Sequence, residues 1–126
     1  MNSNNQLTSI IIEHAIHVHR TLAPGLLESA YKTCLAHSLS KTGLTIVKER
    51  PIPVVFEEIT MECGYRADLI VERKVIVEVK SVDALAEIHK AQLLTYLRLT
   101  NIRFGLLINF NVLLLKDGVR RIVNGY

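Results

Sequence analysis

The chain has 126 residues, of which 49% are hydrophobic and 21% are charged. This length predicts a single domain, and this composition excludes an intrinsically disordered chain. The net charge of +3 is concentrated in residues 64–126, which carry 10 basic against 6 acidic side chains. A surplus of this size suits a polyanion partner but does not require one.

Three further features bear on location. The longest apolar stretch, residues 105–115, is about half as long as the ~20 residues of a membrane helix, so we expect no membrane span. The N-terminus lacks the basic and apolar regions of a signal peptide. Cys34 and Cys63 stand in no metal-binding spacing. These features predict reduced thiols and a cytoplasmic protein.

The first third of the chain is predicted to form two helices. Residues 1–7 are polar and are expected to be a flexible tail. Apolar residues then recur at helical spacing over residues 8–22, and Pro24-Gly25 ends that pattern. A second helix is predicted over residues 26–40, with Gly43 just beyond its end.

From residue 44 the pattern is typical of β-structure. Residues 44–57 are rich in Val, Ile and Pro and predict one strand, with Pro51 and Pro53 near an edge or a bulge. Residues 65–71 and 75–80 are two further β-like runs that only three residues separate.

The last third is predicted to hold one helix and three strands. The helix spans residues 82–99, and residues 103–109 form a continuous apolar strand of the fully buried kind. Asp117-Gly118 is the strongest hairpin signal of the chain, and it predicts that residues 111–116 pair with residues 119–123. The economical packing is a central mixed sheet with helices on both faces.

The run of residues 65–80 contains the candidate chemistry. Because side chains alternate along a strand, Glu78 and Lys80 point to the same face. If the loop between the two strands has three residues, Val71 pairs with Val75, and Asp68 then lies opposite Glu78. Two carboxylates at directly opposed positions repel each other. A two-residue turn would instead send Asp68 to the other face.

A divalent cation between the two carboxylates would turn this repulsion into binding. Mg²⁺ typically uses one or two carboxylates together with waters and substrate phosphate. Lys80 beside such an ion could hold a hydroxide or stabilise charge at a phosphorus centre. The alternative is that Glu78 and Lys80 form a solvated ion pair and Asp68 is merely exposed. Aliphatic residues on both faces of the strand argue against it, since they indicate a strand covered on both sides.

Two other segments contribute polar side chains. On the helix of residues 82–99, Gln92 and Tyr96 lie on one face, where they can orient a phosphate or a metal-bound water. Alternatively, they form a helix rim whose polar tips reach solvent. Glu28 stands in the first turn of its helix, where the helix dipole favours a negative charge in any case.

These residues resemble a known family. Gly25-x-x-Glu28-x-x-Tyr31 resembles the signature of the GxxExxY family, a branch of the PD-(D/E)XK nuclease-like superfamily. Asp68 followed by Glu78-Val79-Lys80 is similar to the D…ExK core pattern of that superfamily. Gln92-x-x-x-Tyr96 resembles the QxxxY motif of its RecB-like and lambda-exonuclease-like members. The chain departs from the pattern at Ala67, where a proline often stands.

The resemblance implies one α/β domain over residues 1–126, with a restriction-endonuclease-like αβββαβ core and a central mixed sheet flanked by helices. It implies a nuclease that hydrolyses phosphodiester bonds by in-line attack of water, with Mg²⁺ or Mn²⁺ as cofactor. The residues that would bind the metal are Glu28, Asp68 and Glu78. Lys80 would position or help activate the water, and Gln92 and Tyr96 would support the site and the phosphate.

The expected partner is nucleic acid, with DNA favoured over RNA. The candidates for contact with its backbone are Arg66, Lys90, Arg98 and Arg103. A small domain covers few phosphates, so a homodimer or a protein partner is also expected. The alternative function is a non-catalytic module on the same fold that binds nucleic acid or protein, and a third is an interaction protein with purely structural carboxylates. Against the module, all six residues of the motifs are present.

Overall fold

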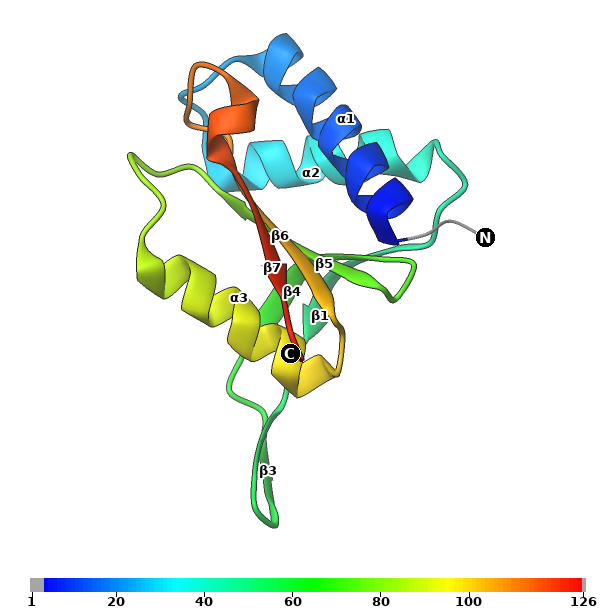
Figure 1. Ribbon diagram of the computed structural model, residues 1–126, viewed down its shortest axis with the longest axis vertical. Helices are drawn as coiled ribbons and strands as arrows, with labels where there is room; N and C mark the ends of the chain where they lie inside the picture. The colour runs from blue at the N-terminus through cyan, green and yellow to red at the C-terminus, as the bar shows by residue number, and fades with distance from the viewer. Residues whose placement is uncertain (1–3, 126) are drawn as a thin grey trace.

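The structure, a computed structural model, describes residues 4–125 (Figure 1). In chain order its elements are α1 (Asn4–Leu22), α2 (Glu28–Ser40), β1 (Ile46–Pro51), β2 (Val54–Phe56), β3 (Ile59–Met61), β4 (Arg66–Val71), β5 (Val75–Lys80), α3 (Glu87–Thr100), β6 (Phe104–Asn109), a 3-10 helix (Leu115–Gly118) and β7 (Val119–Val123). No helix within residues 4–125 is long and apolar enough to cross a membrane.

Five strands form a central mixed sheet in the order β1-β4-β5-β6-β7. β5 and β6 are parallel, and the other neighbours are antiparallel. The helices α1 and α2 cover one face of the sheet, and α3 covers the other (Figure 1). This confirms the predicted α/β class and is consistent with the restriction-endonuclease-like arrangement.

The alternation of side chains along β4 and β5 divides the core into two layers. Leu69 and Val77 pack with the apolar stripes of α1 and α2, while Ile70 and Ile76 pack against α3. Both faces of these strands are therefore shielded from solvent. A charged side chain on either strand is buried unless it stands near a strand end.

The N-terminal prediction requires one correction. α1 begins at Asn4, so residues 4–7, which were expected to belong to a flexible tail, are helical. The reason is Leu7, which lies one turn before Ile11 on the same stripe and is fully buried with it. Residues 1–3 of the predicted tail lie outside the described residues.

The prediction of one strand over residues 44–57 was wrong. The segment forms β1 in the central sheet and β2 in a separate hairpin with β3, a strand that was not predicted. Between them Ile52 is buried, and its N–H donates to the Tyr65 carbonyl at 2.8 Å, so the chain leaves and rejoins the sheet at this point. The hairpin projects away from the body of the molecule (Figure 1).

The C-terminal third differs in two respects. The helix begins at Glu87 instead of residue 82, after a loop over residues 81–86. Residues 111–116 form no strand, and β7 pairs with β6 instead. Gly118 serves close packing, since a Cβ there would collide with the carbonyl oxygen of Asn109. The Asp117-Gly118 signal therefore reflected tight packing and not a hairpin turn.

Candidate active site

The hairpin of β4 and β5 brings two carboxylates together. Its loop has three residues, and Val71 pairs with Val75, as predicted. The N–H of Asp68 donates to the Glu78 carboxylate at 2.8 Å, and the N–H of Val79 donates to the Asp68 carboxylate at 2.8 Å. Each carboxylate is thus fixed by a backbone amide of the opposite strand. The predicted register holds from Leu69–Val77 to Val71–Val75, and just beyond it these two hydrogen bonds place Asp68 and Glu78 next to each other.

Burial makes this pair electrostatically unfavourable. Glu78 is only 5% exposed, and Asp68 is half-buried. Burial, with the nearby Asp68 carboxylate as second cause, raises the pKa of Glu78 to about 8. Burial also raises the pKa of Asp68, against the opposing effects of the Val79 hydrogen bond and the Lys32 ammonium. Two adjacent acids that are both hard to ionise are typical of a functional site.

Lys80 ends β5 on the same face as Glu78 and is half-buried. Its positive charge is close enough to lower the pKa of both Asp68 and Glu78. It forms no ion pair with any residue in the described range 4–125. The alternative of a solvated Glu78–Lys80 ion pair is therefore wrong: the glutamate is buried, and the ammonium remains available.

The turn before α2 explains the glycine and the tyrosine of the GxxExxY-like motif. Gly25 has a φ of 106°, which disfavours any residue with a Cβ. The Tyr31 hydroxyl donates to the Ala23 carbonyl at 2.6 Å and accepts the Leu26 N–H at 3.1 Å. The Tyr31 ring stacks on Phe110, with centroids 4.7 Å apart. Gly25 and Tyr31 thereby set the point at which α2 begins.

Glu28 is the first residue of α2 and is exposed. The Ser81 hydroxyl donates to the Leu26 carbonyl at 2.6 Å, so the start of α2 is held beside the end of β5. Within residues 4–125, however, no three His, Cys, Asp or Glu side chains are grouped closely enough to bind a metal. The structure brings Asp68 and Glu78 together without adding Glu28 to the pair, and the role of Glu28 stays a prediction.

The helix α3 contributes an aromatic side chain to the site. Tyr96 is largely buried, and its ring centroid lies 6.3 Å from that of Tyr65. Burial raises the pKa of Tyr96, and the Glu78 charge adds to this effect. Gln92 lies one turn earlier on the helix and is half-buried. The roles of Gln92 and Tyr96 at the site stay predictions.

Sequence reasoning missed two charged residues, Lys32 and Glu49. The Lys32 ammonium lies 3.5 Å from Asp68 Oδ1 and also forms an ion pair with Glu49. The hydrogen bond to Glu49 is the main cause that raises the pKa of Lys32. Lys32 was detectable, because it stands one helical turn after Glu28. Glu49 was not, because its position depends on a φ of 53° in the middle of β1.

The four basic residues predicted to contact nucleic acid do not form one cluster. Arg66 lies beside the site, where its guanidinium donates to the Glu49 carbonyl at 3.4 Å. Lys90 forms an ion pair with Glu87 at 3.2 Å, and Arg98 is exposed in the last turn of α3. Arg103 lies at the opposite end of the sheet from Lys80, with its guanidinium 5.4 Å from the Phe104 ring centroid. Arg66 alone of the four is tied to the site by a contact described above.

Three basic residues that were not predicted to contact nucleic acid lie around Glu49. A hollow of about 530 Å³ lies along β1. Its lining includes Glu49 together with Lys48, Arg50 and Arg73. A polyanion that approached Asp68 from this side would meet positive charge before it met the carboxylates.

The buried carboxylates fit a hard divalent cation. Asp68 and Glu78 offer oxygen ligands, and the cation would relieve the repulsion that raises their pKa values. The side-chain amide of Asn109 supports this end of the sheet, since it binds both the N–H and the carbonyl of Val82. The residues present are therefore those that Mg²⁺ or Mn²⁺ prefers.

Comparison with known proteins gives one match. The family model described as PD-(D/E)XK nuclease superfamily matches residues 5–122. No curated protein and no solved structure matches the chain. The matched range includes every residue of the site described above.

Proposed function

The chain belongs to the PD-(D/E)XK nuclease superfamily, and from this membership we propose that it is a metal-dependent nuclease that hydrolyses phosphodiester bonds of nucleic acid, DNA rather than RNA. The observation that supports this most strongly is the buried Asp68–Glu78 pair with Lys80 beside it. Burying two opposed carboxylates is unfavourable unless they have a task. We also propose that the chain is a member of the GxxExxY branch, because Gly25 and Tyr31 together shape the turn that leads into Glu28.

In this proposal Asp68 and Glu78 hold Mg²⁺ or Mn²⁺, and Glu28 is a further ligand. The bound cation would supply Lewis-acid polarisation of the phosphate and charge stabilisation in the transition state. The chain itself supplies rigidity. Each carboxylate accepts a backbone N–H group of the opposite strand, which restrains the orientation of its oxygens.

Lys80 has two properties that suit it to handle the attacking water. It lies on the same face as Glu78, and it has no partner in an ion pair within residues 4–125. Its ammonium can donate to the water oxygen and favour the hydroxide form. That oxygen attacks phosphorus while the proton of the water passes to solvent, the bond to the leaving oxygen breaks, and the leaving oxygen takes up a proton from solvent. Tyr96 and Gln92 orient the phosphate from the side of α3.

The test is cleavage of labelled single-stranded, duplex and branched DNA and of RNA, with Mg²⁺ or Mn²⁺. Wild type is compared with Lys80→Ala and Glu78→Ala, and the exposed Lys41→Ala is the matched control. We expect metal-dependent cutting that both site variants lose and the control keeps. A folded wild type that neither cuts any substrate nor binds Mn²⁺ would overturn the proposal in favour of a non-catalytic binding module.

A further inference from the structure

The ion-pair network at Asp68 contains more charge than the proposed reaction uses. The Lys32 ammonium lies between the carboxylates of Asp68 and Glu49. The exposed fractions of the side chains are 24% for Lys32, 17% for Asp68 and 43% for Glu49. The network therefore extends from the interior, where Asp68 stands, to the surface, where Glu49 stands.

The backbone of Glu49 is unusual for a strand. Its φ of 53° lies in the left-handed region, which non-glycine residues rarely adopt inside β-structure. The neighbours Lys48 and Arg50 keep their register with β4, opposite Leu69 and Ala67, so the distortion is confined to one residue. A strained residue of this kind persists only where the surrounding structure holds it. Here it places a carboxylate on the Lys32 ammonium.

The two oxygens of Asp68 have different partners. Oδ2 accepts the N–H of Val79, whereas Oδ1 faces Lys32 at 3.5 Å. A divalent cation bound to Asp68 would have to use the oxygen that Lys32 faces or lie within a few ångströms of it. A cation and an ammonium so close together repel each other. The ammonium and the cation therefore compete for one carboxylate.

We propose that Lys32 is a displaceable counter-ion of the metal site and that Glu49 is the residue that receives it. Without a divalent cation, Lys32 balances the charge of Asp68. When the cation binds, Lys32 moves off Asp68 and stays paired with Glu49. Metal affinity is then set by the pair of Lys32 and Glu49 as well as by the ligands. This inference rests on the proposed function, because it assumes that Asp68 binds the cation.

The test is calorimetric titration of Mn²⁺ into the full chain, which needs no substrate. Lys32→Gln removes the competitor, and we expect it to bind Mn²⁺ about tenfold more tightly than wild type. Glu49→Gln removes the second ion-pair partner of Lys32, so that Lys32 stays paired with Asp68. We expect the affinity for Mn²⁺ to fall about fivefold. The matched controls are Lys90→Gln and Glu87→Gln, which remove an exposed ion pair elsewhere and are expected to change nothing.

The double variant of Lys32→Gln and Glu49→Gln separates competition from simple charge effects. If Glu49 acts through Lys32, Glu49→Gln has almost no effect once Lys32 is gone. Equal fold-changes for Glu49→Gln in both backgrounds would overturn the proposal, because independent charges or direct ligation by Glu49 give that result. So would unchanged affinity in Lys32→Gln. If neither wild type nor Lys32→Gln binds Mn²⁺, the proposed nuclease function itself is what fails.

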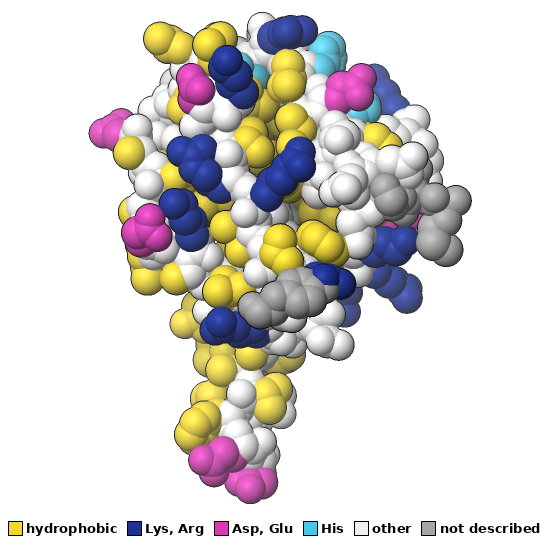
Figure 2. Space-filling view, in the orientation of Figure 1, with side chains coloured by type: hydrophobic (Ala, Val, Ile, Leu, Met, Phe, Trp, Pro, Cys, Tyr) yellow, Lys and Arg dark blue, Asp and Glu magenta, His cyan; other side chains and the backbone are white. Residues whose placement is uncertain are grey.

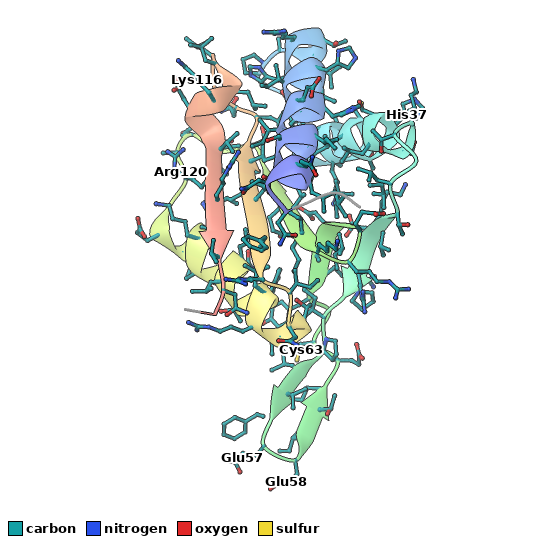
Figure 3. All side chains as sticks on the ribbon, turned by 45° about the vertical axis from the view of Figure 1, so that its right-hand side comes forward. His37, Glu57, Glu58, Cys63, Lys116 and Arg120 are labelled. Atoms are coloured by element: carbon teal, nitrogen blue, oxygen red, sulfur yellow. The ribbon has the colours of Figure 1, made fainter. Side chains whose placement is uncertain are left out.

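A second, independent observation concerns the hairpin of β2 and β3, which extends away from the body (Figures 1 and 3). Its apolar side chains are exposed: 62% for Phe56, 56% for Val55 and 55% for Ile59. A lone two-stranded hairpin is only marginally stable in water. Exposed apolar side chains gathered on one projection mark a contact surface.

The charge of the hairpin indicates what it does not bind. Residues 52–63 contain three glutamates and no Lys or Arg. Glu57 and Glu58 stand at the tip, where Figure 3 shows them pointing away from the body. Figure 2 shows the same pattern on the surface, with acidic groups at the end and hydrophobic groups along the projection. A phosphate backbone would be repelled by this tip.

The same chain has a complementary surface at β7. This strand is an edge of the central sheet, so one side of its backbone has no strand partner among the described residues. Arg120 and Arg121 are exposed on it, and Val123 at its end is 48% exposed. Lys116 precedes it, and Figure 3 shows Lys116 near the end of the molecule opposite the hairpin tip and Arg120 further along the same side of the body. The β7 edge is therefore basic and apolar where the hairpin is acidic and apolar.

We propose that the hairpin of one copy docks on the β7 edge of a second copy. In the resulting two-fold dimer, the hairpin of the second copy docks on the β7 edge of the first in the same way. Each contact buries the apolar side chains of the hairpin and pairs its glutamates with arginines. The reciprocal arrangement gives a closed dimer and not a chain of molecules. It also leaves the basic hollow along β1 free for nucleic acid.

Light scattering after size exclusion, over a wide range of concentration, tests the dimer. We expect wild type to be a dimer and Phe56→Ser to be a folded monomer. The charge reversals E57R/E58R and R120E/R121E are each expected to be monomeric alone and to form a heterodimer when mixed, because both contacts then regain opposite charges. A monomeric wild type, or charge-reversal variants that stay dimeric alone, would overturn the proposal.

Discussion

Replacing Glu78 with glutamine is predicted to stabilise the metal-free protein at alkaline pH. Glutamine has nearly the same shape, and its side-chain oxygen can still accept the N–H of Asp68. What it removes is a buried negative charge beside the Asp68 carboxylate. The variant therefore isolates the electrostatic contribution of one carboxylate.

The size of the effect follows from the pKa of Glu78, which rises from 4.5 to about 8 on folding. A pKa difference of one corresponds to about 1.4 kcal/mol, so this rise amounts to roughly 5 kcal/mol of lost stability once Glu78 is fully ionised. Because the pKa is higher in the folded state, folded protein binds the proton more tightly than unfolded protein. Stability is then greatest below about pH 4.5 and falls until the pH exceeds about 8.

The measurement is urea unfolding in the presence of a chelator at several values from about pH 5 to about pH 9. Glu78→Gln should match wild type at the acidic end and exceed it by several kcal/mol at the alkaline end. The control is Glu87→Gln, whose side chain is 90% exposed and should give no pH-dependent difference. Parallel stability curves for wild type and Glu78→Gln would refute the reasoning, because Glu78 would then ionise as easily in the folded as in the unfolded chain.

Three further predictions concern the metal, the turn before α2 and the hairpin. Saturating Mn²⁺ should raise the midpoint of thermal unfolding, by the equivalent of about 3 kcal/mol at a hundred times the dissociation constant, and Asp68→Ala should abolish the rise. Tyr31→Phe should lower the free energy of unfolding by about 1–3 kcal/mol, measured in urea, because the Ala23 carbonyl and the Leu26 N–H both lose their partner. In the monomeric Phe56→Ser variant, hydrogen exchange should be faster for the amides of β2 and β3 than for those of β5, which has strands on both sides; equal protection would contradict the marginal stability of a lone two-stranded hairpin.

The parts of the fold that could be predicted are those determined by short-range patterns. The register of β4 and β5 follows from a three-residue loop, and it brings Asp68 and Glu78 next to each other just beyond its last pair, Leu69–Val77. Local patterns gave wrong predictions where contacts between distant parts of the chain determine which strands pair. β7 pairs with β6 across the chain, and nothing within residues 111–123 indicates that choice. The split of residues 44–57 into two sheets likewise depends on the burial of Ile52.

The candidate site divides in the same way. Glu78, Lys80 and Asp68 could be related because strand alternation and a hairpin register connect them. The place of Glu49 at the site could not be predicted, because it depends on the left-handed backbone conformation that Glu49 itself adopts inside a strand. A glutamate in β1 would otherwise be read as an ordinary surface residue.

The charged groups around Asp68 do not balance. Three carboxylates, those of Asp68, Glu78 and Glu49, stand near two ammonium groups, those of Lys32 and Lys80. The remaining negative charge is concentrated where burial makes it most unfavourable, which is why the pKa of Glu78 reaches about 8. A site arranged only for stability would replace Glu78 with an apolar residue, since both neighbours on its strand are buried and aliphatic. The excess of buried carboxylate over ammonium is therefore the property that a divalent cation would correct, and the same excess makes metal-free stability the most direct measure of the site.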